Sequence, residues 1–216
     1  MKKNILENKV VVAMTKATDL MIISVYWLLL CIPVITIVPS TAALYYTSVK
    51  AVRRDRGNLT SEFFQAFKMN LKQGMLISLI YVIIGVVLYT CIDFSRGVGL
   101  DTGLGKLYFT FGIVAGILIM MLTFYLIPAL SRFQVGITGL FRLALYFTAR
   151  NLVTLIPLIL TFVMACVTIY CIVPLICIIP GAYCYLLSYS VESTFKKYIQ
   201  DHMTSDADQS EMWFME

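Results

Sequence analysis

The stretch CIPVITIVPSTAALYYTSVKAVRRDRGNL, from Cys31 to Leu59, decides how the chain is organised. It passes two prolines without a charge and then reaches a run of four basic residues, Lys50, Arg53, Arg54 and Arg56. An apolar run of this kind either crosses a membrane once or reverses at the prolines and crosses back. The two interpretations place the basic run on opposite sides of the bilayer, so the topology of the whole chain depends on the choice.

The composition indicates that a lipid bilayer is the solvent of this chain. Hydrophobic residues make up 60% of the 216 residues, and charged residues only 13%. A soluble domain carries about 25% charged residues, which is twice the share found here. We therefore expect one integral membrane domain over residues 1–200, followed by an acidic, disordered tail over residues 201–216.

The net charge of +5 does not indicate a nucleic-acid partner. The basic residues do not follow one face of a soluble domain. They gather between apolar runs, where Lys and Arg set the orientation of membrane proteins. The expected partner of this surface is the lipid bilayer.

Three uncharged runs are long enough to cross a bilayer, which takes about 20 helical residues. Gln73–Ile92 has the length of one span, and Leu107–Ser131 is somewhat longer. Asn151–Val191 has twice the length of a span and contains three prolines, so we interpret it as a helical hairpin that turns near Tyr170–Pro174. These runs account for four crossings.

The remaining run, Leu20–Val49, is long for one upright helix and short for two. Two crossings put fifteen of the seventeen basic residues on the cytoplasmic side, as the distribution of Lys and Arg in short loops favours. A single crossing gives five spans and needs the N-terminus and its lysines outside. We expect an all-α transmembrane bundle of six spans with both termini in the cytoplasm, and five spans remain the alternative.

The prolines supply a physical basis for the reversal, because proline ends one helix and suits the first turn of the next. We expect the second helix to run from Pro39 to about Arg54. The broken segment could bind a ligand through exposed backbone groups, as discontinuous helices do. A tight structural turn, satisfied by its own hydroxyl groups, is the interpretation we favour. The candidate residues of this broken-helix site are Pro33, Thr36, Pro39, Ser40 and Thr41.

The segment TSEFFQAFKMNLKQG, which begins at Thr60, has the pattern of an amphipathic helix over Thr60–Gln73. Its phenylalanines fall on one face and its lysines on the other, and Thr60 is the expected N-cap. This helix could dock into a cytoplasmic partner or lie on the anionic leaflet, and both alternatives stay open. The candidate docking residues are Phe63, Phe64, Phe67, Lys68, Asn70 and Lys72.

Two loosely similar halves, about 10–92 and 107–191, each hold a span, a proline followed by small residues, a basic segment with phenylalanines and another span. Inverted or parallel repeats of this sort are common in membrane proteins. We expect Arg53, Arg132 and Phe133 to support the cytoplasmic elements, with Arg132 and Phe133 against the amphipathic helix. An arginine that only reaches the headgroups is the alternative for Arg132.

The sequence offers no catalytic machinery. No Asp, Glu, Lys, Arg or His lies inside the four crossings counted first, which argues against a proton-driven pump. No HExxH, GxSxG or P-loop spacing occurs. The six cysteines form no CxxC pair and the one histidine is His202, so no zinc site is indicated. We expect no enzyme activity, no cofactor and no metal ion.

Several of these residues resemble the pattern of one family. They are Pro33, Thr36, Pro39–Leu44, Arg53, Gly57–Asn58, Phe63–Phe64, Phe67–Gly74 and Pro128–Phe133. Together they resemble the YesL family, small polytopic membrane proteins of bacteria, over roughly Lys9 to Lys197. Val38 departs from the pattern, because a glycine is expected before the proline.

The resemblance implies a multi-pass protein of the bacterial cytoplasmic membrane with no established activity. It also implies genes that lie beside components of carbohydrate-uptake ABC transporters. The function hypothesis is therefore a non-catalytic accessory protein that contacts a permease or ATPase subunit of a carbohydrate ABC importer. A small stand-alone transporter or channel is the alternative. A regulatory role of the tail through Trp213 and Phe214 is a third hypothesis.

Overall fold

A computed structural model describes residues 2–99, 102–133 and 135–202, and this part of the chain is helical without a strand. The predicted all-α class is confirmed. The α-helices are α1 (Lys2–Leu30), α2 (Ile37–Thr47), α3 (Leu59–Val98), α4 (Gly103–Arg132), α5 (Ile137–Arg150), α6 (Leu152–Cys171) and α7 (Ile179–His202). Short 3-10 helices η1 (Val34–Thr36) and η3 (Val173–Cys177) and a π-helix η2 (Ser48–Arg53) complete the elements.

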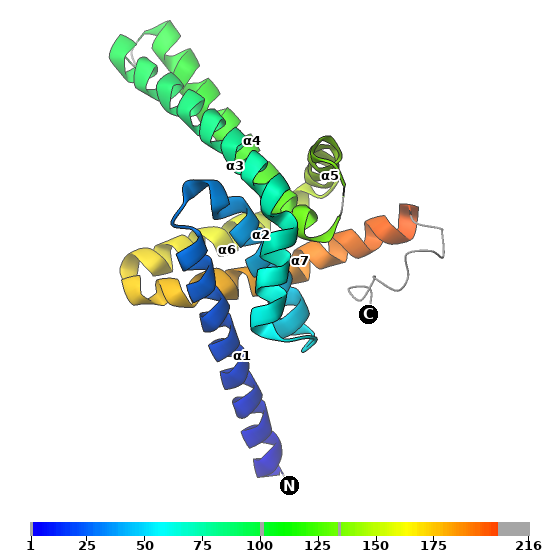
Figure 1. Cartoon of the computed structure of the whole chain (residues 1–216). Coiled ribbons are helices and arrows are strands. Elements are labelled where there is room, and N and C mark those ends of the chain that lie inside the picture. The colour runs from blue at the N-terminus through cyan, green and yellow to red at the C-terminus, as the bar shows by residue number, and fades with distance from the viewer. Residues whose placement is uncertain (1, 100–101, 134, 203–216) are drawn as a thin grey trace.

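The chain reverses at the proline pair. Helix α1 ends at Leu30, η1 follows Pro33, and α2 then runs back beside α1 toward η2 (Figure 1). Pro39 lies in the first turn of α2, where its missing N–H leaves no intrahelical partner unsatisfied. Because η2 continues α2 without a break, the return segment is only slightly shorter than a complete span.

Helix α3 corrects one expectation from the sequence. A separate amphipathic helix over Thr60–Gln73 is wrong, because those residues form the first part of a continuous 40-residue helix. Its N-cap is Asn58 rather than Thr60. No proline interrupts Leu59–Val98, so nothing in the sequence stops the helix where its surface changes from amphipathic to apolar.

Four of the described helices are long and apolar enough to cross a membrane: α1 over Val11–Leu30, α3, α4 and α6 over Thr154–Cys171. Three of them contain runs that the sequence predicted as spans. The turn predicted near Tyr170–Pro174 is also present, between α6 and α7. Helix α7 is not among the four, and Glu192, Lys196 and Lys197 lie in its second half.

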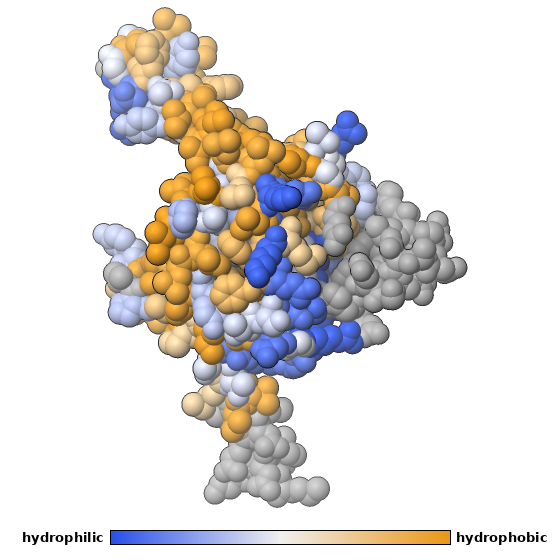
Figure 2. All heavy atoms as spheres, viewed as in Figure 1, coloured by the Kyte–Doolittle hydropathy of each residue, from blue (hydrophilic) through white to orange (hydrophobic). Residues whose placement is uncertain are grey.

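Helices α3 and α4 pair along their length and form an arm that extends away from the rest of the molecule (Figure 1). Hydrophobic side chains cover the arm below its tip, and hydrophilic ones gather on the lower right part of the body in this view (Figure 2). The exposed apolar residues of the arm include Val82, Ile83, Val86, Val87, Leu107 and Phe111. An apolar surface of this extent needs lipid or another protein to cover it.

The core lies where α2, the first part of α3, the end of α4, α5 and α7 meet. Its largest fully buried side chains include Tyr45, Tyr125, Phe63, Phe147 and Phe195. Asp201 and His202 complete α7, and the rest of the predicted tail, with Trp213 and Phe214, lies outside the described residues.

Candidate functional site

The hydroxyl groups of the broken-helix site are engaged with neighbouring groups of the turn. Thr36 lies with its Oγ1 2.7 Å from the carbonyl oxygen of Pro33. Ser40 donates to the carbonyl of Thr36, and Thr41 donates to the carbonyl of Ile37 over 2.6 Å. Trp27 Nε1 in turn donates to Thr41 Oγ1 over 3.0 Å. These bonds support the interpretation as a structural turn.

Serines on neighbouring helices satisfy backbone N–H groups where α2 and α7 begin. The N–H of Val38 donates to Ser78 Oγ of α3 over 3.3 Å, and the N–H of Gly181 donates to Ser24 Oγ of α1 over 2.9 Å. The first N–H groups of a helix have no partner within the helix. Because hydrocarbon offers none either, these serines make both helix starts compatible with a membrane.

The aromatic residues predicted for partner docking pack mostly against the chain itself. The ring of Phe63 is fully buried and lies 5.7 Å from the ring of Tyr26 on α1. Phe64 is 39% exposed, yet its ring also lies 5.6 Å from Tyr26. Phe67 is partly buried against the core, and Asn70 Nδ2 donates to its own helix at Ala66.

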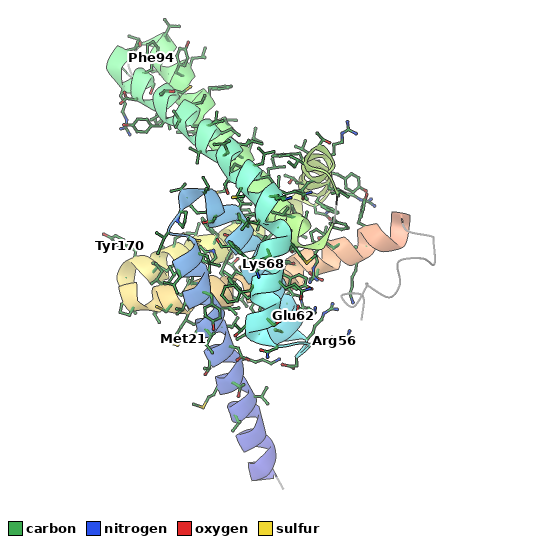
Figure 3. All side chains as sticks on the ribbon, viewed as in Figure 1. Met21, Arg56, Glu62, Lys68, Phe94 and Tyr170 are labelled. Carbon is green, nitrogen blue, oxygen red and sulfur yellow. The ribbon has the colours of Figure 1, made fainter. Side chains whose placement is uncertain are left out.

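Of the six predicted docking residues, Phe64, Lys68 and Lys72 are exposed. Figure 3 shows Lys68 on α3 above Glu62, with Arg56 in the loop below. This part of α3 therefore offers both basic and aromatic side chains to other molecules. The docking role of these residues stays a prediction.

A buried carboxylate joins four elements at the base of the arm. Glu192 of α7 is 3% exposed, and its Oε1 accepts hydrogen bonds from Arg132 Nε over 3.0 Å and Nη2 over 2.7 Å. Tyr45 of α2 donates its hydroxyl to the same oxygen over 3.1 Å. Arg54, directly after η2, lies 4.0 Å from the second oxygen, Oε2, which has no hydrogen-bond partner among the described residues.

The three residues predicted as cytoplasmic support all contact α7. Arg53 Nη1 donates to Ser188 Oγ over 3.1 Å, and its guanidinium lies 4.0 Å from the ring centre of Tyr189, a cation–π distance. Arg132 binds Glu192, as described. The ring of Phe133 lies 5.3 Å from that of Phe195.

The contacts at 188–189, 192 and 195 recur every three or four residues, so they follow one face of α7. Arg53 and Arg132 come from η2 and α4, and Phe133 directly follows α4. The three predicted residues are thus brought together, but around α7 rather than around the amphipathic part of α3. We name Arg53, Arg54, Arg132, Phe133 and Glu192 with Tyr45 the α7 clamp.

Glu192 was missed because it directly follows the long uncharged run that ends at Val191. An acid at the end of a predicted span is expected to face water at the membrane surface. A signal was nevertheless present: Cys184, Leu187, Ser188, Val191 and Phe195 are all buried at helical spacing, and Glu192 falls on the same face.

Positive charge is concentrated around η2. Burial, and the neighbouring guanidinium groups of Arg132, Arg53 and Arg56, lower the pKa of Arg54, against the opposing effect of Glu192. Lys50 differs, because its Nζ donates hydrogen bonds to Tyr46 Oη over 3.1 Å and to Glu62. Lys50 Nζ lies 2.7 Å from Glu62 Oε2, and Lys16 of α1 lies 3.4 Å from Asp55.

Comparison with known protein families gives one match over part of the chain. Residues 20–92 match a family of unknown function. The model of that family is described as "Protein of unknown function, DUF624". No curated protein and no solved structure matches the chain.

The family match covers about a third of the chain, from the second half of α1 to six residues before the end of α3. It includes the broken-helix site, Tyr45, Arg53 and Arg54. The remaining members of the α7 clamp, among them Arg132 and Glu192, lie beyond it. Within the described residues no group of three His, Cys, Asp or Glu side chains could hold a metal ion.

Proposed function

We propose that the chain is a non-catalytic, multi-pass protein of the bacterial cytoplasmic membrane, with six spans and both termini in the cytoplasm. Support comes from four helices of spanning length and from the reversal between α1 and α2. The basic η2 segment then faces the cytoplasm together with the second half of α7. Because the arm places Arg96 at its far end, that residue faces outward.

Labelling of single cysteines tests this topology. The native cysteines are first replaced, and Arg56→Cys or Arg96→Cys is then introduced. An impermeant thiol reagent added to intact cells should label the cysteine at position 96 and leave that at position 56 unlabelled. Labelling at position 56 would contradict the six-span topology, and the Arg96→Cys protein controls for reagent access.

The proposed role is that of an accessory protein, which contacts a permease or ATPase subunit of a carbohydrate ABC importer. The observation that carries it is the exposed basic surface of α3 at Lys68 and Lys72, held in place by the packing of Phe63 against α1. The carbohydrate transporter itself is suggested by the resemblance to the YesL family. A rigid, basic helix on the cytoplasmic side suits an acidic surface of a cytoplasmic subunit.

Co-purification tests this role. Tagged protein from cells grown on the relevant sugar should retain importer subunits, and Lys68→Glu with Lys72→Glu should reduce their recovery at least tenfold. Arg96→Glu with Lys106→Glu makes the same charge change at the other end of the arm and should have no effect. Recovery of no importer subunit with the parent protein would contradict the proposal.

The alternative, a small transporter or channel, is favoured by one observation, the buried charge of Glu192 among span helices. Ionisable groups in such places often mark ion or substrate pathways. Purified protein in liposomes would then conduct a labelled ion or sugar, and Glu192→Gln, Pro39→Ala or Thr41→Val would reduce the flux. No flux above that of empty liposomes excludes this alternative.

A further inference from the structure

Helix α5 connects two helices of spanning length and is itself too short to cross a bilayer. Its 14 residues extend about 21 Å, less than the hydrocarbon thickness of about 30 Å. Four residues separate it from the end of α4, and only Asn151 separates it from the start of α6. Because α4 and α6 are both apolar enough to span a membrane, these short connections hold α5 at the surface where α4 leaves the bilayer and α6 enters it.

Two contacts with the arm agree with this position of α5. Gln73 Nε2 of α3 donates to the carbonyl oxygen of Val135, just before α5 begins, over 3.3 Å. Gln73 is the first residue of the uncharged run that follows Lys72, so α5 begins beside the point where α3 changes from basic to apolar. In Figure 1, α5 is seen nearly end-on while the arm extends across the picture, so α5 runs crosswise to α3 and α4. A helix crosswise to two spans lies along the membrane surface.

The side chains of α5 form three rows of residues three or four positions apart, and each row follows one side of the helix. The first row is buried in the core and consists of Leu140, Ala144 and Phe147. The second row is apolar and consists of Ile137, Phe141 and Leu145. The third row is polar and consists of Thr138, Arg142, Tyr146 and Arg150. The apolar and polar rows flank the exposed side of α5, where Leu145 is 58% exposed.

Arg142 is an exposed cation without an acidic neighbour. No Asp or Glu occurs between Asp101 and Glu192 in the sequence, and Glu192 is engaged in the α7 clamp. Within the described part of the chain no carboxylate pairs with Arg142. Arg150 differs, since its Nη1 donates to the hydroxyl of Tyr146 in the same row. Positive charge beside an exposed apolar row is the pattern of a helix at the boundary between headgroups and acyl chains.

We propose that α5 lies in the membrane interface and binds anionic phospholipid. The row with Phe141 and Leu145 inserts beside the upper parts of the acyl chains, and the guanidinium of Arg142 binds the phosphate of an anionic headgroup. Another protein chain is the competing occupant. Lipid is favoured because both ends of α5 are fixed to spans and the row next to Arg142 is apolar. The inference does not depend on the importer partner proposed above.

Quenching of a tryptophan by brominated lipid tests the position of α5 in the full-length protein. Trp27→Phe and Trp213→Phe remove the native tryptophans, and Leu145→Trp provides a reporter on the apolar row. In nanodiscs of phosphatidylcholine, bromine near the headgroup end of the acyl chains should quench this reporter at least twofold more than bromine near their far end. Val86→Trp, in the middle of α3, is the matched control and should show the opposite order.

Two outcomes would overturn this position. The first is no quenching at position 145, as expected if a second copy of the chain covered this row or if it faced water. The second is stronger quenching at position 145 by the deeper bromine, because α5 would then lie within the hydrocarbon rather than at its boundary.

The same reporter tests the preference for anionic lipid. A small fraction of brominated phosphatidylglycerol in phosphatidylcholine nanodiscs should quench the tryptophan at position 145 at least twofold more than the same fraction of brominated phosphatidylcholine. The attraction of one basic residue to an anionic surface corresponds to about a fivefold local enrichment. Arg142→Gln should remove the preference and Arg142→Lys should retain it. Arg96→Gln, at the far end of the arm, should leave it unchanged.

The variants also separate Arg142 from the other cations. Equal quenching by the two lipids with Arg142 intact would contradict the binding of anionic lipid at α5. A preference that persists in Arg142→Gln would assign the lipid to other basic side chains and overturn the role of Arg142. Size-exclusion chromatography of each variant checks that the fold is kept, which is expected because position 142 is exposed.

Discussion

At the scale of single residues, Glu192 is the buried charge at which α7 meets α2 and α4. Its carboxylate is 3% exposed and Arg132 is 2% exposed. Charges this deeply buried destabilise a folded protein unless they are paired. Loss of one partner therefore leaves the other as an unpaired buried charge. The hydroxyl of Tyr45 shares the same oxygen, so three elements depend on one side chain.

Removal of one partner of this pair should therefore destabilise the protein strongly. We expect Glu192→Leu alone to lower the free energy of unfolding by about 3–5 kcal/mol, because it leaves Arg132 buried without its carboxylate. The double variant Glu192→Leu and Arg132→Met should regain most of that loss. Thermal unfolding in detergent, followed by size-exclusion chromatography, measures both. A double variant no more stable than the single one would contradict this.

Two glycines of α3 allow a matched comparison of packing. A Cβ on Gly74 would lie 2.8 Å from the side chain of Pro39, whereas one on Gly85 would meet nothing within 4 Å. Gly74→Ala should cost about 1–3 kcal/mol through overpacking at the contact of α2 and α3. Gly85→Ala should be neutral or slightly stabilising, because alanine is the better helix former. The same unfolding measurement distinguishes them, and equal stabilities would argue against close contact at Pro39.

At the scale of elements, the sequence predicted where helices break better than where they continue. Pro33 and Pro174 lie in the two turns between helices, because proline is unfavourable in a helix interior. Pro128 inside α4 and Pro157 inside α6 show that a proline alone does not mark a break. The sequence did not predict that residues 59–73 and the span after them form one continuous helix. Amphipathic periodicity indicates which side of a helix is buried but does not say where the helix ends.

The serines that accept hydrogen bonds from the first N–H groups of α2 and α7 could not be identified from the sequence. Ser24, for example, is 157 residues away from Gly181. We expect Ser24→Ala to lower the free energy of unfolding by about 1 kcal/mol, the usual effect of a lost N-terminal cap. Ser193→Ala, on the exposed side of α7, is the control and should have little effect. Hydrogen exchange should show faster exchange at the start of α7 in Ser24→Ala alone. Unchanged exchange there would contradict the capping role.

At the scale of the whole molecule, composition sufficed to predict a membrane protein. The contacts that hold its helices together could not be predicted. The α7 clamp brings together Arg53, Arg132 and Glu192 from three separate parts of the chain. Only the first two were selected in advance, and of these Arg132 was expected to contact the amphipathic segment that follows Thr60. Contacts between residues so far apart in the sequence depend on how the helices pack against one another. The periodicity within a single helix carries no information about that packing.

The length of α3 leads to a prediction about how the molecule sits in the bilayer. Its 40 residues extend about 60 Å, twice the hydrocarbon thickness of about 30 Å. Only part of α3 can lie in hydrocarbon. The exposed residues Lys68, Val86 and Arg96 lie in the first part, the middle and the last turns of the helix. From Lys68 to Arg96 the helix rises about 42 Å, so both charged ends can reach water.

Spin labels attached after Lys68→Cys, Val86→Cys and Arg96→Cys, in a background without native cysteines, test this placement. In power-saturation EPR the label at position 86 should respond to oxygen, which concentrates in lipid. Labels at positions 68 and 96 should respond to a water-soluble nickel chelate, because the basic end of α3 and the tip of the arm lie outside the hydrocarbon. If the label at position 68 responded mainly to oxygen, the basic surface of α3 would lie within the membrane. It would then be out of reach of a cytoplasmic partner.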